Sequence, residues 1–236
     1  MVRVKKFREV LDKTGRFDKR PFFQTEDLDI TCEQIVTKFL HSTNGKVEFP
    51  ISTEDLKRLV EENVSDLDCY ADLSEFGSDV EGVTLFYPGS KPEVWISATL
   101  TEDGRRENRL RTTLTHEFGH VIFHSYLFDL RSLTSSFPQS ATENQIVCKR
   151  DGILNATEVD WMEWQAGYVC GSILMPKTHI NRFVQNFCEQ HSLVGSIGLT
   201  SQEANKLIED VALTFQVSKD AARIRLLKLS NLDTTP

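Results

Sequence analysis

The sequence predicts an α+β fold in which a small antiparallel sheet packs on a pair of helices and a C-terminal helical subdomain follows. The sheet is expected within residues 66–100, where short apolar runs rich in β-branched and aromatic side chains are separated by Gly77, Gly82 and a Pro-Gly turn. The helix pair is expected at residues 105–127 and 158–175, where apolar residues recur with helical spacing. The chain has 236 residues, enough for one globular unit with at most a small appendage.

The first elements lie before the sheet. Residues 1–24 hold eight Lys and Arg against three Asp and Glu, a balance of +5 that is typical of a solvated extension. The alternative is an arm that docks on an acidic partner. A helix is expected at about 29–42, before an Asn-Gly pair, and a second helix should begin at Ser52, because Ser52 and Asp55 have the spacing of a capping box.

The strands and the later helices follow in order. Three strands are expected, at Leu67–Leu73, Val80–Tyr87 and Val94–Ala98. Residues 128–157 are rich in Ser, Thr, Asn and Gly and predict a long loop. Up to three further helices are expected, at about 177–190, 201–215 and 218–229. The chain is therefore divided into a basic extension (1–24), a domain with the sheet and the helix pair (25–192), and a helical subdomain (193–236).

Charge and cysteine content limit the possible functions. The net charge of −8 and a pI near 5.3 argue against a protein whose main work is to bind nucleic-acid phosphates, since that requires clustered Lys and Arg. The five cysteines are widely spaced, form no CxxC pair and follow no apolar signal segment, so we expect reduced thiols and a cytoplasmic location. No apolar run approaches the roughly 18 residues that span a bilayer, and no membrane partner is expected.

The most informative segment is the HExxH pattern at residues 116–120. His116 and His120 are four residues apart, so on a helix they lie on one face, one turn apart, and both imidazoles can bind one metal ion. The apolar residues of this helix cluster on the opposite side, at Leu114, Phe118, Val121 and Ile122. A histidine that only filled the core would be expected on that apolar side. The pattern therefore favours a metal site, and zinc suits its geometry.

A catalytic zinc ion needs a third protein ligand and an open position for water. The metzincin arrangement is excluded because its third histidine would fall at Tyr126. Glu163 is the preferred ligand, because the small side chains around it on helix 158–175 would let two helices approach closely. Asp160 and Glu158 lie in the same neighbourhood and are the alternatives.

Two motifs in this order resemble a known family. The HExxH helix reads Leu-Thr-His-Glu-Phe-Gly-His-Val-Ile-Phe-His over residues 114–124, and Glu163 begins a Glu-Trp-Gln-Ala-Gly segment that is followed by Ile-Leu-Met-Pro at 173–176. This resembles the ImmA/IrrE family of zinc metallo-endopeptidases, over about residues 45–232, whose pattern is HExGHxxxH followed by an ExxAN helix that ends in LLMP. Gly167 stands where the family usually has Asn.

The resemblance implies a gluzincin-like helix pair in which His116, His120 and Glu163 bind Zn²⁺ and Glu117 is the general base. It implies an intracellular endopeptidase of regulatory type that cleaves a helix-turn-helix repressor or an antitoxin controlling a mobile element or a stress response. DNA is a less favoured partner. The alternative is a non-catalytic, zinc-stabilised regulatory module that binds protein or DNA.

Several assignments stay open. An extended substrate could add to Val94–Ala98 as an edge strand. His124 is expected behind the ligands rather than among them, and Cys148 in the long loop could occupy the open zinc position. The side chain that stabilises the oxyanion is not identified among three tyrosines, Tyr87, Tyr126 and Tyr168.

The C-terminal helices have a second interpretation. Residues 212–226 resemble the centre of a helix-turn-helix, with Ser218 as the N-cap of the second helix. Residues 200–236 nevertheless balance five basic groups against five acidic ones. We therefore favour a helical subdomain packed on the protease over a DNA-binding one.

Overall fold

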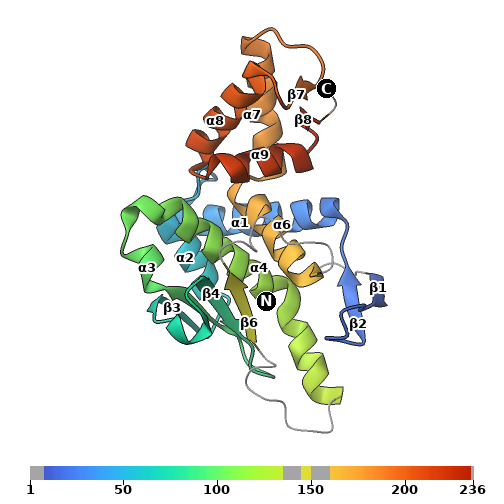
Figure 1. The fold of residues 1–236 in the computed structure, drawn as a ribbon, viewed down its shortest axis with the longest axis vertical. Helices are drawn as coiled ribbons and strands as arrows, with labels where there is room; N and C mark the ends of the chain where they lie inside the picture. Colours follow the sequence, from blue (N-terminus) through green and yellow to red (C-terminus); the bar gives the residue numbers. More distant parts are fainter. Residues whose placement is uncertain (1–7, 135–144, 150–159, 235–236) are drawn as a thin grey trace.

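The structure, a computed structural model, describes residues 8–134, 145–149 and 160–234 and has the α+β class predicted (Figure 1). A larger lobe holds the sheet and four helices: α1 (Thr25–Asn44), α2 (Thr53–Glu61), α4 (Glu107–Thr134) and α6 (Trp161–Leu174). A smaller lobe stands above it and holds α7 (Lys177–Gln190), α8 (Gln202–Phe215) and α9 (Lys219–Lys228). Within these described ranges, no helix combines the length and the apolar character needed to cross a membrane.

The sheet is mixed, so the prediction of an antiparallel sheet was only partly right. Its strands are β3 (Asp66–Ala71), β4 (Val80–Leu85), β5 (Glu93–Ser97) and β6 (Gln145–Lys149), in the order β3-β5-β4-β6. β4 is antiparallel to β5 and to β6, but β3 is parallel to β5. β5 lies between β3 and β4, so β3 pairs with β5, and these two strands run in the same direction. β3 and β4, which follow each other in the sequence, are therefore not neighbours in the sheet.

This strand order changes where a substrate strand could pair. β5, which contains most of the predicted strand Val94–Ala98, is hydrogen-bonded on both sides, to β3 and to β4. The expectation that an extended substrate adds to this strand was wrong, because β5 has no free edge. The outer strands of the described sheet are β3 and β6.

Part of the predicted loop at 128–157 is regular structure. α4 continues past residue 127 to Thr134, and β6 forms from Gln145 to Lys149. The cause is an apolar cluster that joins the two: Phe128 stacks on Phe86 with ring centroids 3.9 Å apart, and Ile146 of β6 is buried beside them. The polar composition of the segment concealed these few apolar anchors.

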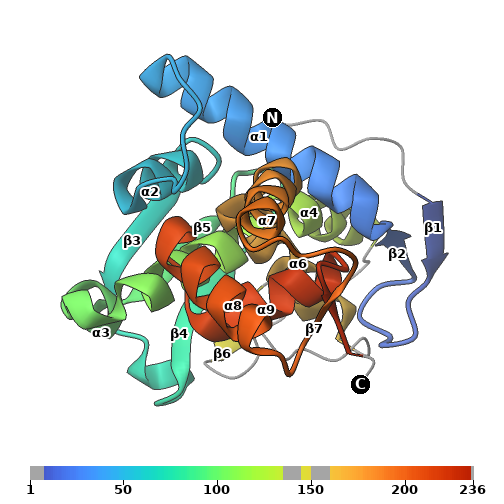
Figure 2. The ribbon, with the colours of Figure 1, turned by 90° about the horizontal axis from the view of Figure 1, so that it is seen from above.

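Helices α1 and α2 follow the sequence-based predictions closely. α1 begins at Thr25, four residues earlier than expected, and buries one apolar face that includes Leu28, Cys32 and Val36. α2 has the predicted cap, in which the Asp55 backbone N–H donates to the Ser52 hydroxyl at 3.0 Å. Seen from above, α1 runs beside α6 from the N-terminal hairpin to α2 (Figure 2).

The described part of the basic N-terminal segment is a β-hairpin rather than a free arm. Its strands, β1 (Arg8–Leu11) and β2 (Lys19–Phe22), are antiparallel. Asp12 closes the turn by accepting from the backbone N–H groups of Thr14 and Phe17. The Trp161 indole N–H also donates to Asp12 at 3.0 Å, so the hairpin is docked on the first residue of α6.

Two buried arginines join the smaller lobe to the larger one. Arg111 of α4 donates to the backbone carbonyls of Phe215 and Gln216, at the turn between α8 and α9, and to that of Ile51. Arg225 of α9 donates to Asp29 of α1 at 2.7 Å. The smaller lobe also contains two short parallel strands, β7 (Ile197–Gly198) and β8 (Leu232–Asp233). Three short helical turns complete the larger lobe: η1 (Ser74–Phe76), α3 (Ala98–Thr101) and η2 (Gly104–Arg106).

Candidate metal centre

The contact between α4 and α6 determines the geometry of the site. Gly119 of α4 lies against Ala166 of α6 so closely that a Cβ atom on Gly119 would come within 3.0 Å of the Ala166 Cα atom. Glu163 is one turn before Ala166, so the same close approach extends its carboxylate toward α4. The small residues that predicted a close helix contact do allow one.

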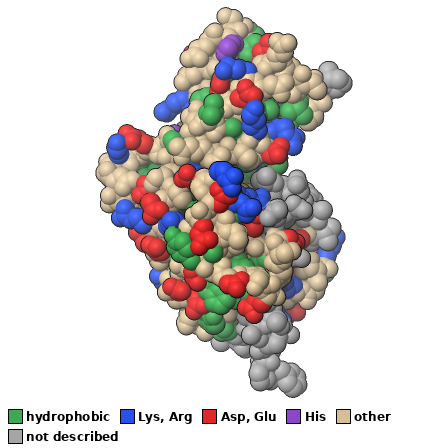
Figure 3. All heavy atoms as spheres, turned by 60° about the vertical axis from the view of Figure 1, so that its left-hand side comes forward, with side chains coloured by type: hydrophobic (Ala, Val, Ile, Leu, Met, Phe, Trp, Pro, Cys, Tyr) green, Lys and Arg blue, Asp and Glu red, His purple; other side chains and the backbone are tan. Residues whose placement is uncertain are grey.

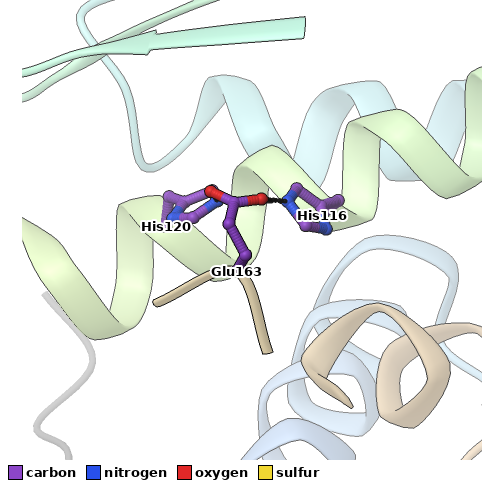
Figure 4. Close-up of side chains that lie close together, drawn as sticks. All are labelled: His116, His120 and Glu163. Carbon is purple, nitrogen blue, oxygen red and sulfur yellow. Dashed lines mark hydrogen bonds and ion pairs between the residues drawn. The ribbon is translucent and has the colours of Figure 1, made fainter. Parts of the chain in front are cut away.

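Three side chains meet at this contact (Figure 4). The His116 Nε2 atom is 3.0 Å from one carboxylate oxygen of Glu163, and the His120 Nε2 atom is 3.3 Å from the other. The two Nε2 atoms are 3.1 Å apart. Both imidazoles are fully buried, whereas the Glu163 side chain is 16% exposed. Of the three side chains, only that of Glu163 is in contact with solvent.

This arrangement could hold a metal ion. The ligand atoms of His116, His120 and Glu163 all lie within 4.8 Å of one another. In a tetrahedral site with bonds of about 2.1 Å, ligand atoms are about 3.4 Å apart. The observed separations of 3.0 to 3.3 Å are close to that value. Two imidazole nitrogens turned toward each other and toward a carboxylate are the pattern that one shared cation explains.

Of the two alternative carboxylates, the structure describes Asp160, which does not join the group. Asp160 is instead the N-cap of α6, and one of its carboxylate oxygens accepts from the Glu163 backbone N–H at 3.4 Å. Glu158 lies outside the described residues. Of the two described carboxylates among these candidates, Glu163 is the one that the fold brings to the histidines.

Charge couples these three residues. Burial by itself raises the pKa of the Glu163 carboxyl, but His120 and His116 outweigh it and hold this pKa below its ordinary value. Burial lowers the pKa of His120, and the Glu163 carboxylate more than offsets this, so the net change is upward. Without a metal the group thus tends to keep a proton between imidazole and carboxylate. A cation would displace that proton, so metal binding should release protons.

Glu117 is buried beside the ligand pair with one carboxylate oxygen bound and the other without a hydrogen bond. The Thr84 hydroxyl of β4 donates to Oε2 at 2.6 Å, while Oε1 has no partner among the described residues. The carboxylate packs under β4, where a Cβ atom on Gly82 would come within 2.5 Å of Oε1. Burial raises the pKa of this carboxyl, against the opposing effect of the two histidines.

The three tyrosines considered for stabilising the oxyanion, and Cys148, lie in different surroundings. The Tyr168 hydroxyl donates to Asp29 and the Tyr87 hydroxyl donates to Glu93. Both are thus hydrogen-bonded outside the cluster of His116, His120 and Glu163, which we call the metal group. Tyr126 lines a hollow beneath the N-terminal hairpin. Cys148 lies opposite Gly82 in the β4–β6 register, and its side chain is outside the described part of the structure.

His124 lies behind the ligands, as predicted. Its Nδ1 atom is 2.9 Å from Nδ1 of His120, and burial holds the pKa of His124 well below its ordinary value, which favours the neutral ring. Thr84, Gly82 and Gln165 also contact the site, and the sequence-based interpretation missed them. No local pattern marks Thr84 or Gly82, whereas Gln165 had one available signal, its place two residues after the third ligand.

The chain matches no protein-family model, and no curated protein matches it either. The ImmA/IrrE resemblance therefore remains an expectation based on the two motifs.

Proposed function

We propose that this protein is a zinc-dependent endopeptidase. The observation that supports this best is the convergence of two imidazoles and one carboxylate from α4 and α6, at 3.0 to 3.3 Å, beside a buried carboxylate with one unbound oxygen. Two histidines and one glutamate form a ligand set that catalytic zinc uses, and it leaves a coordination position for water. The set fits zinc better than calcium or magnesium, which prefer all-oxygen ligands.

In this proposal each residue has one role. His116, His120 and Glu163 hold the metal. When bound, zinc supplies a Lewis acid that polarises a peptide carbonyl and lowers the pKa of water toward about 7. Glu117 takes a proton from the attacking water on its unbound oxygen Oε1 and delivers it to the leaving amine. Thr84 fixes the other oxygen, so Glu117 stays in one orientation during both transfers.

The proposed substrate is a specific protein inside the cell, a helix-turn-helix repressor or an antitoxin that controls a mobile element or a stress response. This part of the proposal is supported by the motif resemblance alone. The reaction itself is supported by the residue chemistry, so the two parts can fail separately.

The competing interpretation, a non-catalytic zinc-stabilised module that binds protein or DNA, receives less support. Arg225 of α9 is buried against Asp29, and the Lys228 ammonium lies 5.1 Å from the ring centre of Tyr168. These two basic groups of the helix that would enter a DNA groove are occupied within the protein. On the face shown in Figure 3, Lys and Arg side chains are interspersed with Asp and Glu rather than gathered in a stripe.

The proposal is tested by incubating the zinc-loaded protein with the product of a neighbouring gene and with a peptide library, and by measuring fragment masses. We expect new fragments that disappear with a chelator and return with added zinc. His120→Ala should lose both zinc and cleavage. The matched control Asp160→Asn should keep both, because Asp160 lies outside the ligand group. Fragments that persist in the chelator would show that cleavage does not depend on the metal.

Gly82→Ala is expected to keep zinc and to lower kcat/KM about 100-fold, the scale of a misplacement of about 1 Å. The added methyl group would come within 2.5 Å of the Glu117 carboxylate and within 2.9 Å of the Thr113 Cγ2 atom, so it would displace both side chains. Zinc content and kcat/KM measure the effect. Gly104→Ala is the control, since a Cβ atom there meets nothing within 4 Å. Unchanged kcat/KM in Gly82→Ala would contradict the placement of Glu117.

A further inference from the structure

A line of hydrogen-bonding groups runs from His120 away from the metal group to the N-terminal hairpin. The Nδ1 atoms of His120 and His124 are 2.9 Å apart, and Nε2 of His124 is 3.0 Å from Oε1 of Gln165. The Gln165 amide nitrogen is 3.5 Å from the backbone carbonyl of Pro21 in β2, which makes this the weakest contact. His120, His124 and Gln165 are all buried.

The last group in this line determines the direction of every hydrogen bond in it. A carbonyl oxygen can only accept, so the Gln165 side chain must turn its NH₂ group to Pro21 and its oxygen to His124. The Nε2 atom of His124 then has to donate, and in a neutral ring Nδ1 is left as an acceptor. Nδ1 of His120 therefore donates to it. When a metal displaces the proton shared with Glu163, Nε2 of His120 is left with a lone pair on the side of His116 and Glu163.

We propose that His124 and Gln165 are positioning residues that hold His120 in the one tautomer able to bind a metal through Nε2, and that the Pro21 carbonyl of the hairpin anchors them. This inference rests on the proposed zinc site. A ligating histidine usually donates its other N–H to a carboxylate, a carbonyl or water. Here the acceptor is a second histidine, whose own state is fixed from outside the helix pair.

The hairpin is held firmly enough to act as this anchor. The Trp161 indole N–H donates to Asp12 at 3.0 Å, and the ring of Phe17 meets that of Phe128 edge-on at 5.4 Å. Trp161 also packs edge-on against the His124 ring, with centroids 5.5 Å apart. The hairpin thus fixes the Gln165 amide and, through Trp161, one side of the His124 ring.

The first test measures zinc affinity by competition with a chromophoric chelator, without any substrate. His124→Phe and Gln165→Met are each expected to weaken zinc binding about 10- to 100-fold, the usual effect of removing a group that orients a ligand. His124→Asn should recover most of this loss, because its side-chain oxygen can accept from His120. Thr115→Val is the matched control, since Thr115 is buried at the same helix contact and hydrogen-bonds to Cys170 rather than to a ligand.

The second test observes the tautomer directly. NMR of the zinc-loaded protein with ¹⁵N-labelled histidine should show His120 protonated at Nδ1, with a coupling across the hydrogen bond to Nδ1 of His124. In Gln165→Met this coupling should weaken or vanish even if the variant is fully folded. A His120 ring protonated at Nε2, or a His124 ring that donates from Nδ1, would overturn the inference.

These outcomes separate the positioning role from the proposed enzyme. If the wild-type protein binds no zinc, both the positioning role and the proposed zinc enzyme are contradicted. Zinc affinity that is unchanged in His124→Phe and in Gln165→Met would overturn the positioning role but would not contradict the proposed peptidase activity. The expected loss of affinity, together with no cleavage of any substrate by the wild type, would support the positioning role and count against the peptidase.

Discussion

Glu117→Gln is expected to bind zinc as the wild type does and to lose about 10²- to 10⁴-fold in kcat/KM, the usual contribution of a general acid–base group. The amide has the same shape, and its oxygen can still accept from Thr84. It cannot take a proton from water at the position of Oε1, nor return one to a leaving amine. Metal content and kcat/KM on the identified substrate measure the two effects separately.

The matched control for this variant is Glu81→Gln. Glu81 is a buried carboxylate on the neighbouring strand β4 and is paired with Arg109, away from the metal group. It should lose some stability and keep its kcat/KM. If Glu117→Gln cleaves as fast as the wild type, Glu117 is not the base. If it loses cleavage but keeps full biological activity, the non-catalytic module becomes the better interpretation.

Arg225→Met is expected to lower the free energy of unfolding by about 3 kcal/mol, because the buried Asp29 carboxylate loses its counter-charge and keeps only the hydrogen bonds from Tyr168 and Ser172. The pair is well enclosed: the Arg225 side chain is 2% exposed and that of Asp29 is 4% exposed. Arg225 also donates to the Met175 carbonyl at the end of α6. Chemical denaturation followed by circular dichroism measures the change.

Arg223→Met is the control on the same helix. Arg223 is 43% exposed and lies 4.0 Å from Asp220, so its loss should cost at most about 1 kcal/mol. The double variant Asp29→Leu with Arg225→Met should be less destabilised than the sum of its parts, since it buries no unpaired charge. Equal losses in Arg225→Met and Arg223→Met would show that the ion pair does not anchor α9.

Local patterns were enough to predict most of the helices and the cluster of His116, His120 and Glu163. The positions of His116 and His120 depend only on helical periodicity, and the cap of α2 depends on two residues three apart. Glu163 required a contact between separate helices. It was still predictable, because small side chains mark a helix that can approach another closely, as Gly119 and Ala166 do here.

Long-range pairing could not be predicted in this way. β6 pairs with β4 by placing residue 148 opposite Gly82, and one isolated apolar cluster supports it. The parallel pairing of β3 with β5 follows from the order of the whole sheet rather than from either strand. The hairpin was missed for a related reason: its basic charge suggested a solvated arm, while Asp12 and Phe17, which dock it, belong to no regular pattern.

Arg111 has a consequence for the size of the folding unit. Arg111 lies on α4, the helix that contains His116, and its side chain is fully buried. Three of its hydrogen bonds go to the backbone carbonyls of Ile51, Phe215 and Gln216. A chain that ended before α8 would lose two of these three acceptors and, with them, the contacts by which Arg111 joins the two lobes. The smaller lobe is therefore part of the same folding unit as the larger one, and a chain shortened in this way is expected to misfold.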